Sequence, residues 1–162
     1  MATKQFLLPI LLLLFNNLHA QSSSEKKFEL SFYTCGMGSN MGAKFLVLDV
    51  QGDDFVYTNE QNPFWDGRPT KKTDTLCLGK IRQTTIDSII DLIQPIQDTL
   101  IYNTNTEVRS GVIQYIRIQY ENRHLQFTLH NASDPVAEKI VALLNSNIPE
   151  DKPRLWLFKT AN

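Results

Sequence analysis

The stretch Phe28–Tyr57, FELSFYTCGMGSNMGAKFLVLDVQGDDFVY, decides the fold. Apolar and polar residues alternate over 27–34, which is the period-2 pattern of a half-buried β-strand. A second β-rich run, 44–50, leads into the turn 51–54, which is rich in glycine and aspartate, and a third strand begins at Phe55. The stretch therefore predicts the start of an antiparallel sheet.

A glycine-rich segment, GMGSNMG over 36–42, connects the first two of these strands. Such loops hold phosphate groups when they open a helix whose N-terminus faces the anion. Here a strand follows the loop instead. We therefore interpret the segment as a connection between strands and not as a phosphate site.

A long hairpin is predicted over 59–75, because Asp66-Gly67 is a two-residue turn signal. That turn places Tyr57 opposite Leu76 and Phe55 opposite Leu78. The pairing sets apolar residues beside apolar residues at the base of the hairpin.

A second hairpin is predicted over 111–130, with Asn122-Arg123 as its turn. This register pairs apolar residues on one face, Tyr120 with Leu125, Ile118 with Phe127 and Ile116 with Leu129. On the other face it pairs Gln119 with Gln126, Arg117 with Thr128 and Tyr115 with His130. One register sorts both faces, which favours the hairpin.

Two helices are predicted, one over 84–94 and one that begins at Asp134-Pro135 and ends near Ser146. The first carries isoleucines at i, i+3, i+4 and i+7 and has Thr84 or Thr85 as its cap. Residues 100–102 fit a brief strand or a helical turn, and 154–158 predict a last strand. The expected class is α+β, an antiparallel sheet with two helices packed on one face and a polar opposite face.

Residues 1–20 have the layout of a secretory signal peptide, with Lys4, an apolar run over 6–15 and a small residue at Ala20. The run is far shorter than the ~20 residues of a membrane-spanning helix. We expect cleavage after Ala20, with an uncleaved anchor as the alternative. Residues 21–26 are then a flexible leader and 27–162 a single domain, exported to the periplasm or beyond with no membrane span.

The composition, 42% hydrophobic and 20% charged over 162 residues, is that of a folded globular protein. A formal net charge of −1 argues against nucleic acid as a partner. Export permits a disulfide between Cys35 and Cys77, which would stabilise the fold by roughly 4 kcal/mol. Two separate buried thiols are the alternative, and the sequence leaves both open.

Catalytic and metal-binding signatures are missing from the sequence. It contains no G-x-S-x-G and no C-x-x-C, and about 20 Å of strand separates His124 from His130. The aspartates near residue 53 fit a turn and lack the spacing of a calcium loop. We therefore expect no enzyme activity, no cofactor and no metal.

Two surfaces are candidates for binding a protein partner. The first is the hairpin tip with Phe64, Trp65 and Arg68, since aromatic residues and arginine are common at interface hot spots. The alternative is that Trp65 folds back against the sheet. The second is the polar sheet face around Tyr115 and Arg117, a candidate for flat contact with a partner or a glycan. An ordinary solvated face is the alternative.

Three short matches give a resemblance to a known family: Cys35-Gly36-Met37-Gly38, Asp49-Val50-Gln51-Gly52 and Val56-Tyr57. Together with the helix–hairpin–helix order of 84–146, the chain resembles a family of small exported bacterial domains of unknown function. Ser39-Asn40 stand where that family has a second cysteine and a proline. The resemblance implies an exported α+β domain and no known chemistry.

The sequence thus predicts a non-enzymatic exported domain, a binding, inhibitor or immunity-like module of the bacterial envelope. Two alternatives remain, a small envelope hydrolase with an unrecognised site and a structural subunit that assembles through an exposed edge strand.

Overall fold

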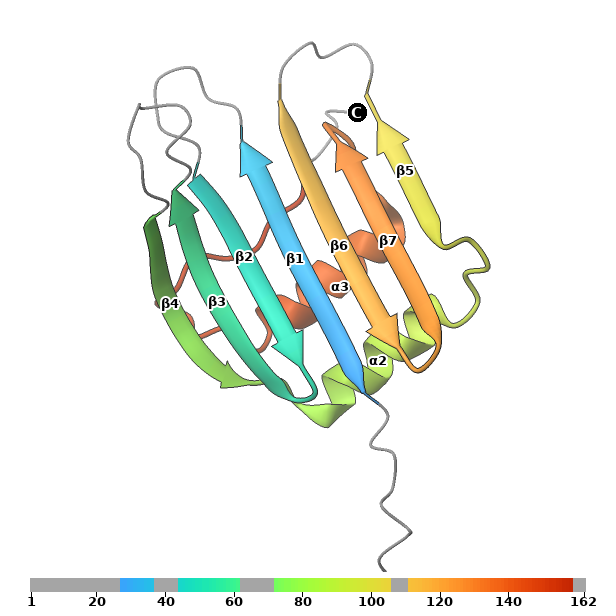
Figure 1. The fold of residues 1–162 in the computed structure, drawn as a ribbon, viewed down its shortest axis with the longest axis horizontal. Coiled ribbons are helices and arrows are strands. Elements are labelled where there is room, and N and C mark those ends of the chain that lie inside the picture. The colour runs from blue at the N-terminus through green and yellow to red at the C-terminus, as the bar shows by residue number, and fades with distance from the viewer. Residues whose placement is uncertain (1–26, 37–43, 62–71, 106–110, 159–162) are drawn as a thin grey trace, which may run out of the picture.

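The structure is a computed structural model that describes residues 27–36, 44–61, 72–105 and 111–158 (Figure 1). Several predictions lie outside these residues. They concern the signal peptide 1–20, the leader 21–26, most of the glycine-rich connection, and the tip with Phe64, Trp65 and Arg68.

The described residues form one seven-stranded sheet and two helices. The strands lie in the order β4-β3-β2-β1-β6-β7-β5. The elements are β1 (Phe28–Gly36), β2 (Lys44–Gln51), β3 (Asp54–Gln61), β4 (Lys72–Lys80), α2 (Gln83–Ile93), β5 (Leu100–Thr104), β6 (Val112–Tyr120), β7 (Arg123–His130) and α3 (Pro135–Asn145). The predicted α+β class, with a mostly antiparallel sheet and two helices, is confirmed. The edge strand β5 departs from the prediction, because it runs parallel to β7.

Strand β1 is the middle strand, paired with β2 on one side and β6 on the other. Its alternation buries Phe28, Leu30 and Phe32, and each fully buried side chain of this kind stabilises the fold by about 1.5–3 kcal/mol. These three belong to one apolar cluster that also contains residues of α2 and α3, such as Ile89 and Leu144. One face of the sheet is therefore the core face.

The predicted register of β3 with β4 is correct from Thr58 onward and wrong for the residues of β3 that precede it. Thr58 lies opposite Thr75, as a turn at Asp66-Gly67 requires. A β-bulge between Tyr57 and Thr58 then shifts the register by one residue, so that Tyr57 lies opposite Cys77. The predicted pairs Tyr57–Leu76 and Phe55–Leu78 do not form.

The bulge brings Gly79 opposite Phe55, and this contact explains why the shift is favourable. A Cβ at residue 79 would lie 2.7 Å from Cε1 and Cζ of the buried Phe55 ring, so the ring packs directly on the glycine. The shift also moves Leu78 to the outer face, opposite Val56, because a one-residue slip exchanges the two faces of a strand.

The β6–β7 hairpin turns one residue earlier than predicted, which shifts the partner of each residue by two. Glu121, with a φ of 54°, and Asn122 form the turn, and Ile118 lies opposite Leu125 instead of Phe127. A shift of two residues keeps every side chain on its predicted face and changes only its partner. Arg123 lies in β7 and not in the turn. Its guanidinium donates to the carbonyl oxygens of Gln94 and Ile96, just after α2, and these bonds hold it there.

The two helices agree with their predicted positions within one residue. Asp134 caps α3 as predicted, with its carboxylate accepting from the backbone N–H groups of Val136 and Ala137 at 2.8 and 3.0 Å. The predicted threonine cap of α2 is wrong, because Arg82 holds the N-cap position without a side-chain bond and Thr85 is buried. No helix in these four ranges is long and apolar enough to cross a membrane.

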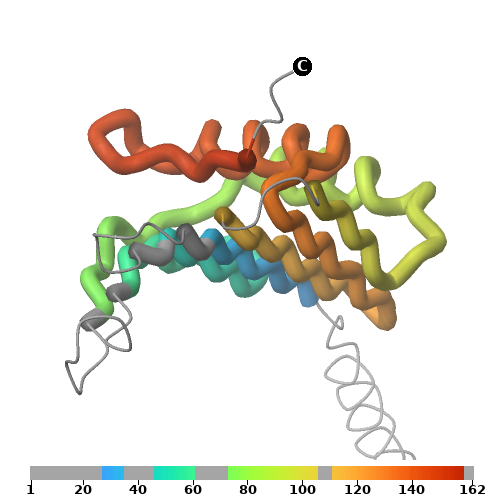
Figure 2. Tube along the Cα trace, turned by 90° about the horizontal axis from the view of Figure 1, so that it is seen from above, coloured from blue at the N-terminus to red at the C-terminus, as the bar shows by residue number. Residues whose placement is uncertain are grey.

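The predicted last strand over 154–158 is also wrong, because side chains replace the strand pairing there. The buried Gln114 amide on β6 donates to the Trp156 carbonyl and to Thr34 Oγ1, and it accepts from the Phe158 N–H at 2.8 Å. Asn145 of α3 makes a similar pair of bonds with the backbone of Leu155. Figure 2 shows this segment on the same side of the sheet as α3.

We predict that Gly79→Ala destabilises the protein by about 1–3 kcal/mol, because the added methyl group overlaps the Phe55 ring. Urea unfolding followed by circular dichroism measures the change. The matched control is Thr75→Ala on the same strand, where the side chain is exposed and the expected change is within about 0.5 kcal/mol. An unchanged midpoint for Gly79→Ala would show that the bulge does not depend on this contact.

Candidate functional site: the open face of the sheet

The face of the sheet opposite the core carries two rows of outward side chains, and we call these two rows the open face. Each row contains one residue from each of several neighbouring strands, and the residues of a row lie directly opposite one another in the register of the sheet. The first row is Leu78, Val56, Asp49, Ser31, Arg117, Gln126 and Leu100. The second row is Thr58, Val47, Tyr33, Tyr115, Thr128 and Tyr102.

Exposed apolar side chains gather at the two lateral edges of the open face. Leu78 and Val56, at the β4 edge, are 70% and 42% exposed, and Leu100 and Tyr102, at the β5 edge, are 56% and 59% exposed. Among the described residues, only one other large hydrophobic side chain, Trp156, is exposed to a similar degree. Two small apolar patches therefore flank the polar centre of this face.

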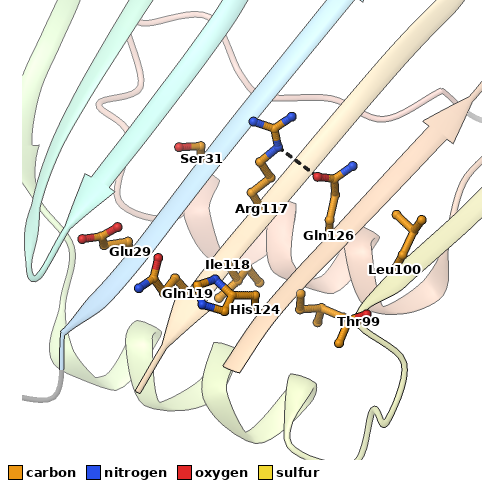
Figure 3. Close-up of a pocket in the computed structure, with 10 residues that line it drawn as sticks. Glu29, Ser31, Thr99, Leu100, Arg117, Ile118, Gln119, His124 and Gln126 are labelled. Carbon is orange, nitrogen blue, oxygen red and sulfur yellow. Dashed lines mark hydrogen bonds between the residues drawn. The ribbon is translucent and has the colours of Figure 1, made fainter. Parts of the chain in front are cut away.

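Arg117 occupies the centre of the open face and is held in place by its neighbours. Its Nε donates to Gln126 Oε1 at 3.0 Å (Figure 3). Gln126 Nε2 donates in turn to Thr128 Oγ1 at 3.0 Å. The guanidinium carbon lies 5.9 Å from the centroid of the Tyr115 ring, within cation–π range. Tyr115 packs against Tyr33 with ring centroids 6.2 Å apart.

Asp49 supplies the opposite charge on the other side of β1. It lies opposite Ser31, and the Ser31 hydroxyl donates to Asp49 Oδ1 at 2.6 Å. Ser31 also lies opposite Arg117 on β6. The centre of the open face is therefore an acid, a hydroxyl and a cation on three successive strands.

Two shallow hollows flank the Arg117 side chain. One, of about 520 Å³, is bounded by Leu100, Gln126 and His124 (Figure 3). The other, of about 460 Å³, is lined by Tyr33, Val47, Asp49 and Tyr115. Both hollows share Ser31 and Arg117, so these side chains separate them on a continuous surface.

The predicted binding residues Tyr115 and Arg117 are brought together here, and the tip residues lie outside the described part of the chain. His124 and His130 are apart from each other in register, since His124 lies opposite Gln119 and His130 opposite Ile113. Within the described ranges no three histidine, cysteine, aspartate or glutamate residues are grouped as metal ligands would be.

Lys80 lies beside Asp53, with Nζ 2.7 Å from Oδ2, and lowers the pKa of that carboxyl, as expected of a turn aspartate in an exposed ion pair.

Sequence reasoning missed the apolar edges of the open face and the place of Asp49 in it. The alternation in Leu100-Ile101-Tyr102 was a usable signal, because Ile101 packs against the core while its neighbours point outward. Leu78 carried no such signal, since its orientation depends on the bulge.

A Cys35–Cys77 disulfide does not fit this sheet. Cys77 has a free thiol, and its strand β4 is separated from β1, which carries Cys35, by β2 and β3. Three strand spacings amount to about 14 Å, whereas the Cα atoms of a disulfide lie within ~7 Å of each other. The side chain of Cys35 lies outside the described residues.

Compared with models of known protein families and with curated proteins, the sequence finds no match in either set.

We predict that Cys77 behaves as a protected thiol. Burial raises the pKa of the Cys77 thiol, which lowers the fraction of reactive thiolate at pH 8. In a Cys35→Ser variant, iodoacetamide should therefore alkylate Cys77 several-fold more slowly in the folded protein than in urea. A wild-type protein with no titratable thiol in urea without reductant would show instead that the cysteines are bonded.

We also predict that Tyr57→Phe leaves stability unchanged or raises it by about 1 kcal/mol at pH 7. The Tyr57 hydroxyl is buried with no hydrogen-bond partner among the described residues, so its removal costs no bond. Burial raises the pKa of Tyr57 to about 12, with a smaller contribution from Cys77.

The stabilities of the wild type and of the Tyr57→Phe variant should depend differently on pH because of that pKa. Above pH ~10 the unfolded tyrosine loses its proton while the folded one keeps it, so the stability of the wild type falls as the pH rises toward 12. The phenylalanine variant lacks this loss, and its advantage should widen between these pH values. A variant less stable than the wild type at pH 7 would reveal a partner for the hydroxyl.

Proposed function

We propose that the chain is an exported, non-enzymatic binding module of the bacterial envelope that contacts a protein partner through the open face. The observation that carries this proposal is the placement of Leu78, Val56, Leu100 and Tyr102 around the Tyr115–Arg117 pair on one sheet face. Aromatic residues and arginine at the centre of a surface are typical of interface hot spots.

The arrangement of the helices supports the same use of the sheet. We infer that α2 and α3 pack side by side on the core face and leave the open face uncovered. Ile89 of α2 and Leu144 of α3 are buried in the common core cluster, together with Phe32 and Phe127 of the sheet. The polar residues of the two helices are then the outer surface on that side, and four of the five exposed large hydrophobic side chains among the described residues belong to the open face.

The chemistry of the open face favours binding over hydrolysis. The Ser31 hydroxyl donates to a carboxylate, Asp49, and no described histidine is bonded to it. Serine nucleophiles are activated by an imidazole that accepts their proton. The envelope hydrolase therefore remains the weaker alternative. Membership of the family of small exported bacterial domains is part of the proposal and rests on the order of the elements.

The test of this function is recovery of partners on the purified protein from bacterial envelope extracts. The double variant Tyr115→Ala/Arg117→Ala should lose bound partner, because truncating hot-spot residues costs at least ~2 kcal/mol, or about 30-fold in affinity. The matched control is Asp87→Ala/Lys139→Ala, which changes two exposed residues of the helices. Equal recovery by both double variants would contradict the use of the open face.

A third variant, Trp65→Ala, separates this surface from the hairpin tip. Loss of partner on this variant alone would move the binding site to the tip. Fractionation of the expressed full-length chain tests export, and its retention in the cytoplasm would contradict that part of the proposal.

A further inference from the structure

We propose that the partner of the open face is a second copy of this chain, docked face to face about a two-fold axis that runs along β1. The inference rests on the proposed function in using the same surface, and it goes further by naming the occupant. It follows from the register of the sheet and from the order of charged and apolar residues along one row.

The two central charges lie symmetrically about β1. Ser31 is opposite Asp49 on β2 and opposite Arg117 on β6, so the acid and the cation each lie one strand spacing, about 5 Å, to either side of it. Their backbones are therefore ~10 Å apart. Neither makes an ion pair with another described residue.

A two-fold axis along β1 exchanges the left and right halves of the sheet and turns the second copy over. Arg117 of the second copy then faces Asp49 of the first, and the same pair forms again on the other side of the axis. This isologous arrangement needs a surface that is complementary to itself. A cation and an acid at equal distances from the axis meet that requirement.

The apolar edges obey the same symmetry. Leu78 and Leu100 are the two ends of the first row, each three strands from β1, and the axis places Leu100 of the second copy against Leu78. Tyr33 of β1, which contacts Tyr115, lies on the axis in the second row and faces its own counterpart. Leu78 and Leu100, two of the three most exposed apolar side chains of the open face, are thus covered by one another.

The geometry of packed sheets is compatible with this pairing. Facing sheets lie ~10 Å apart and cross at about 30°. This rotation moves facing residues that lie ~5 Å from the axis by about 3 Å, which side chains as long as arginine span, and it moves Leu78 and Leu100, ~14 Å from the axis, by about 7 Å along the strands. Seven neighbouring strands, each followed over about six residues, present a face on the order of 600 Å², using the usual strand spacings. That is close to the ~800 Å² per partner of a standard interface.

Charge exchange tests the proposal. Asp49→Arg opposes an introduced arginine to Arg117 of the second copy, and Arg117→Asp opposes an introduced aspartate to Asp49. Each variant alone should self-associate at least ~100-fold more weakly than the wild type, because facing like charges are costly. A one-to-one mixture of the two variants should dimerise again, since every facing pair in the mixed dimer is then opposite in sign.

The measurement is sedimentation equilibrium of the protein in the form that export leaves it, over a range of protein concentrations and at low and high salt. The controls are Asp91→Arg and Lys139→Asp, matched charge changes on the exposed sides of α2 and α3 that should leave the dimer intact. Circular dichroism and urea unfolding of each variant confirm that it is folded. A Leu78→Ser/Leu100→Ser variant tests the apolar edges without changing charge and should also weaken the dimer.

The expected result is a dimeric wild type, two monomeric single variants and a dimeric mixture. A monomeric wild type at every concentration, or a mixture that stays monomeric, overturns the proposal. If the wild type is monomeric yet Tyr115→Ala/Arg117→Ala loses a captured partner, the open face binds a different protein and the proposed function stands. If neither association nor capture responds to the open face, both proposals fail.

Discussion

The pairing of β1 on both sides is the constraint on which the rest of the structure depends. Its side chains alternate between a core and an outer face, and the hydrogen-bonded neighbours β2 and β6 inherit that alternation residue by residue. Because a slip of one residue would exchange the two faces, the burial of Phe28, Leu30 and Phe32 fixes the orientation of the whole sheet. The same register places Ser31 between Asp49 and Arg117.

Alternation and capping made much of the fold predictable. The strands that begin at Phe28 and Lys44 and the Asp134 cap could be predicted because the signal is local. Errors arose where a distant contact decides the register. The Phe55 ring on Gly79 requires a bulge, and the bonds of Arg123 to the end of α2 withdraw that residue from the turn. No local pattern encodes either contact.

The candidate site was predictable in its middle and not at its edges. Tyr115 and Arg117 could be assigned to one face because a two-residue error in register preserves faces. Asp49 could not be joined to them, since only the strand order brings β2 and β6 to either side of β1. The same strand order separates Cys35 from Cys77, which the sequence offered as a candidate disulfide pair.

The position of β1 also means that its two sides pair with strands at very different distances along the chain. Strands β2, β3 and β4 follow it directly and each pairs with the strand before it, but the other neighbour of β1, β6, begins only at Val112. Pairings between residues this far apart close slowly, and an unpaired edge is the part of a sheet most open to wrong association. Until β6 arrives, the strand at the middle of the finished sheet is therefore an exposed edge. An exposed strand edge of this kind is the part of an incompletely folded chain that is most prone to wrong association and that a chaperone protects.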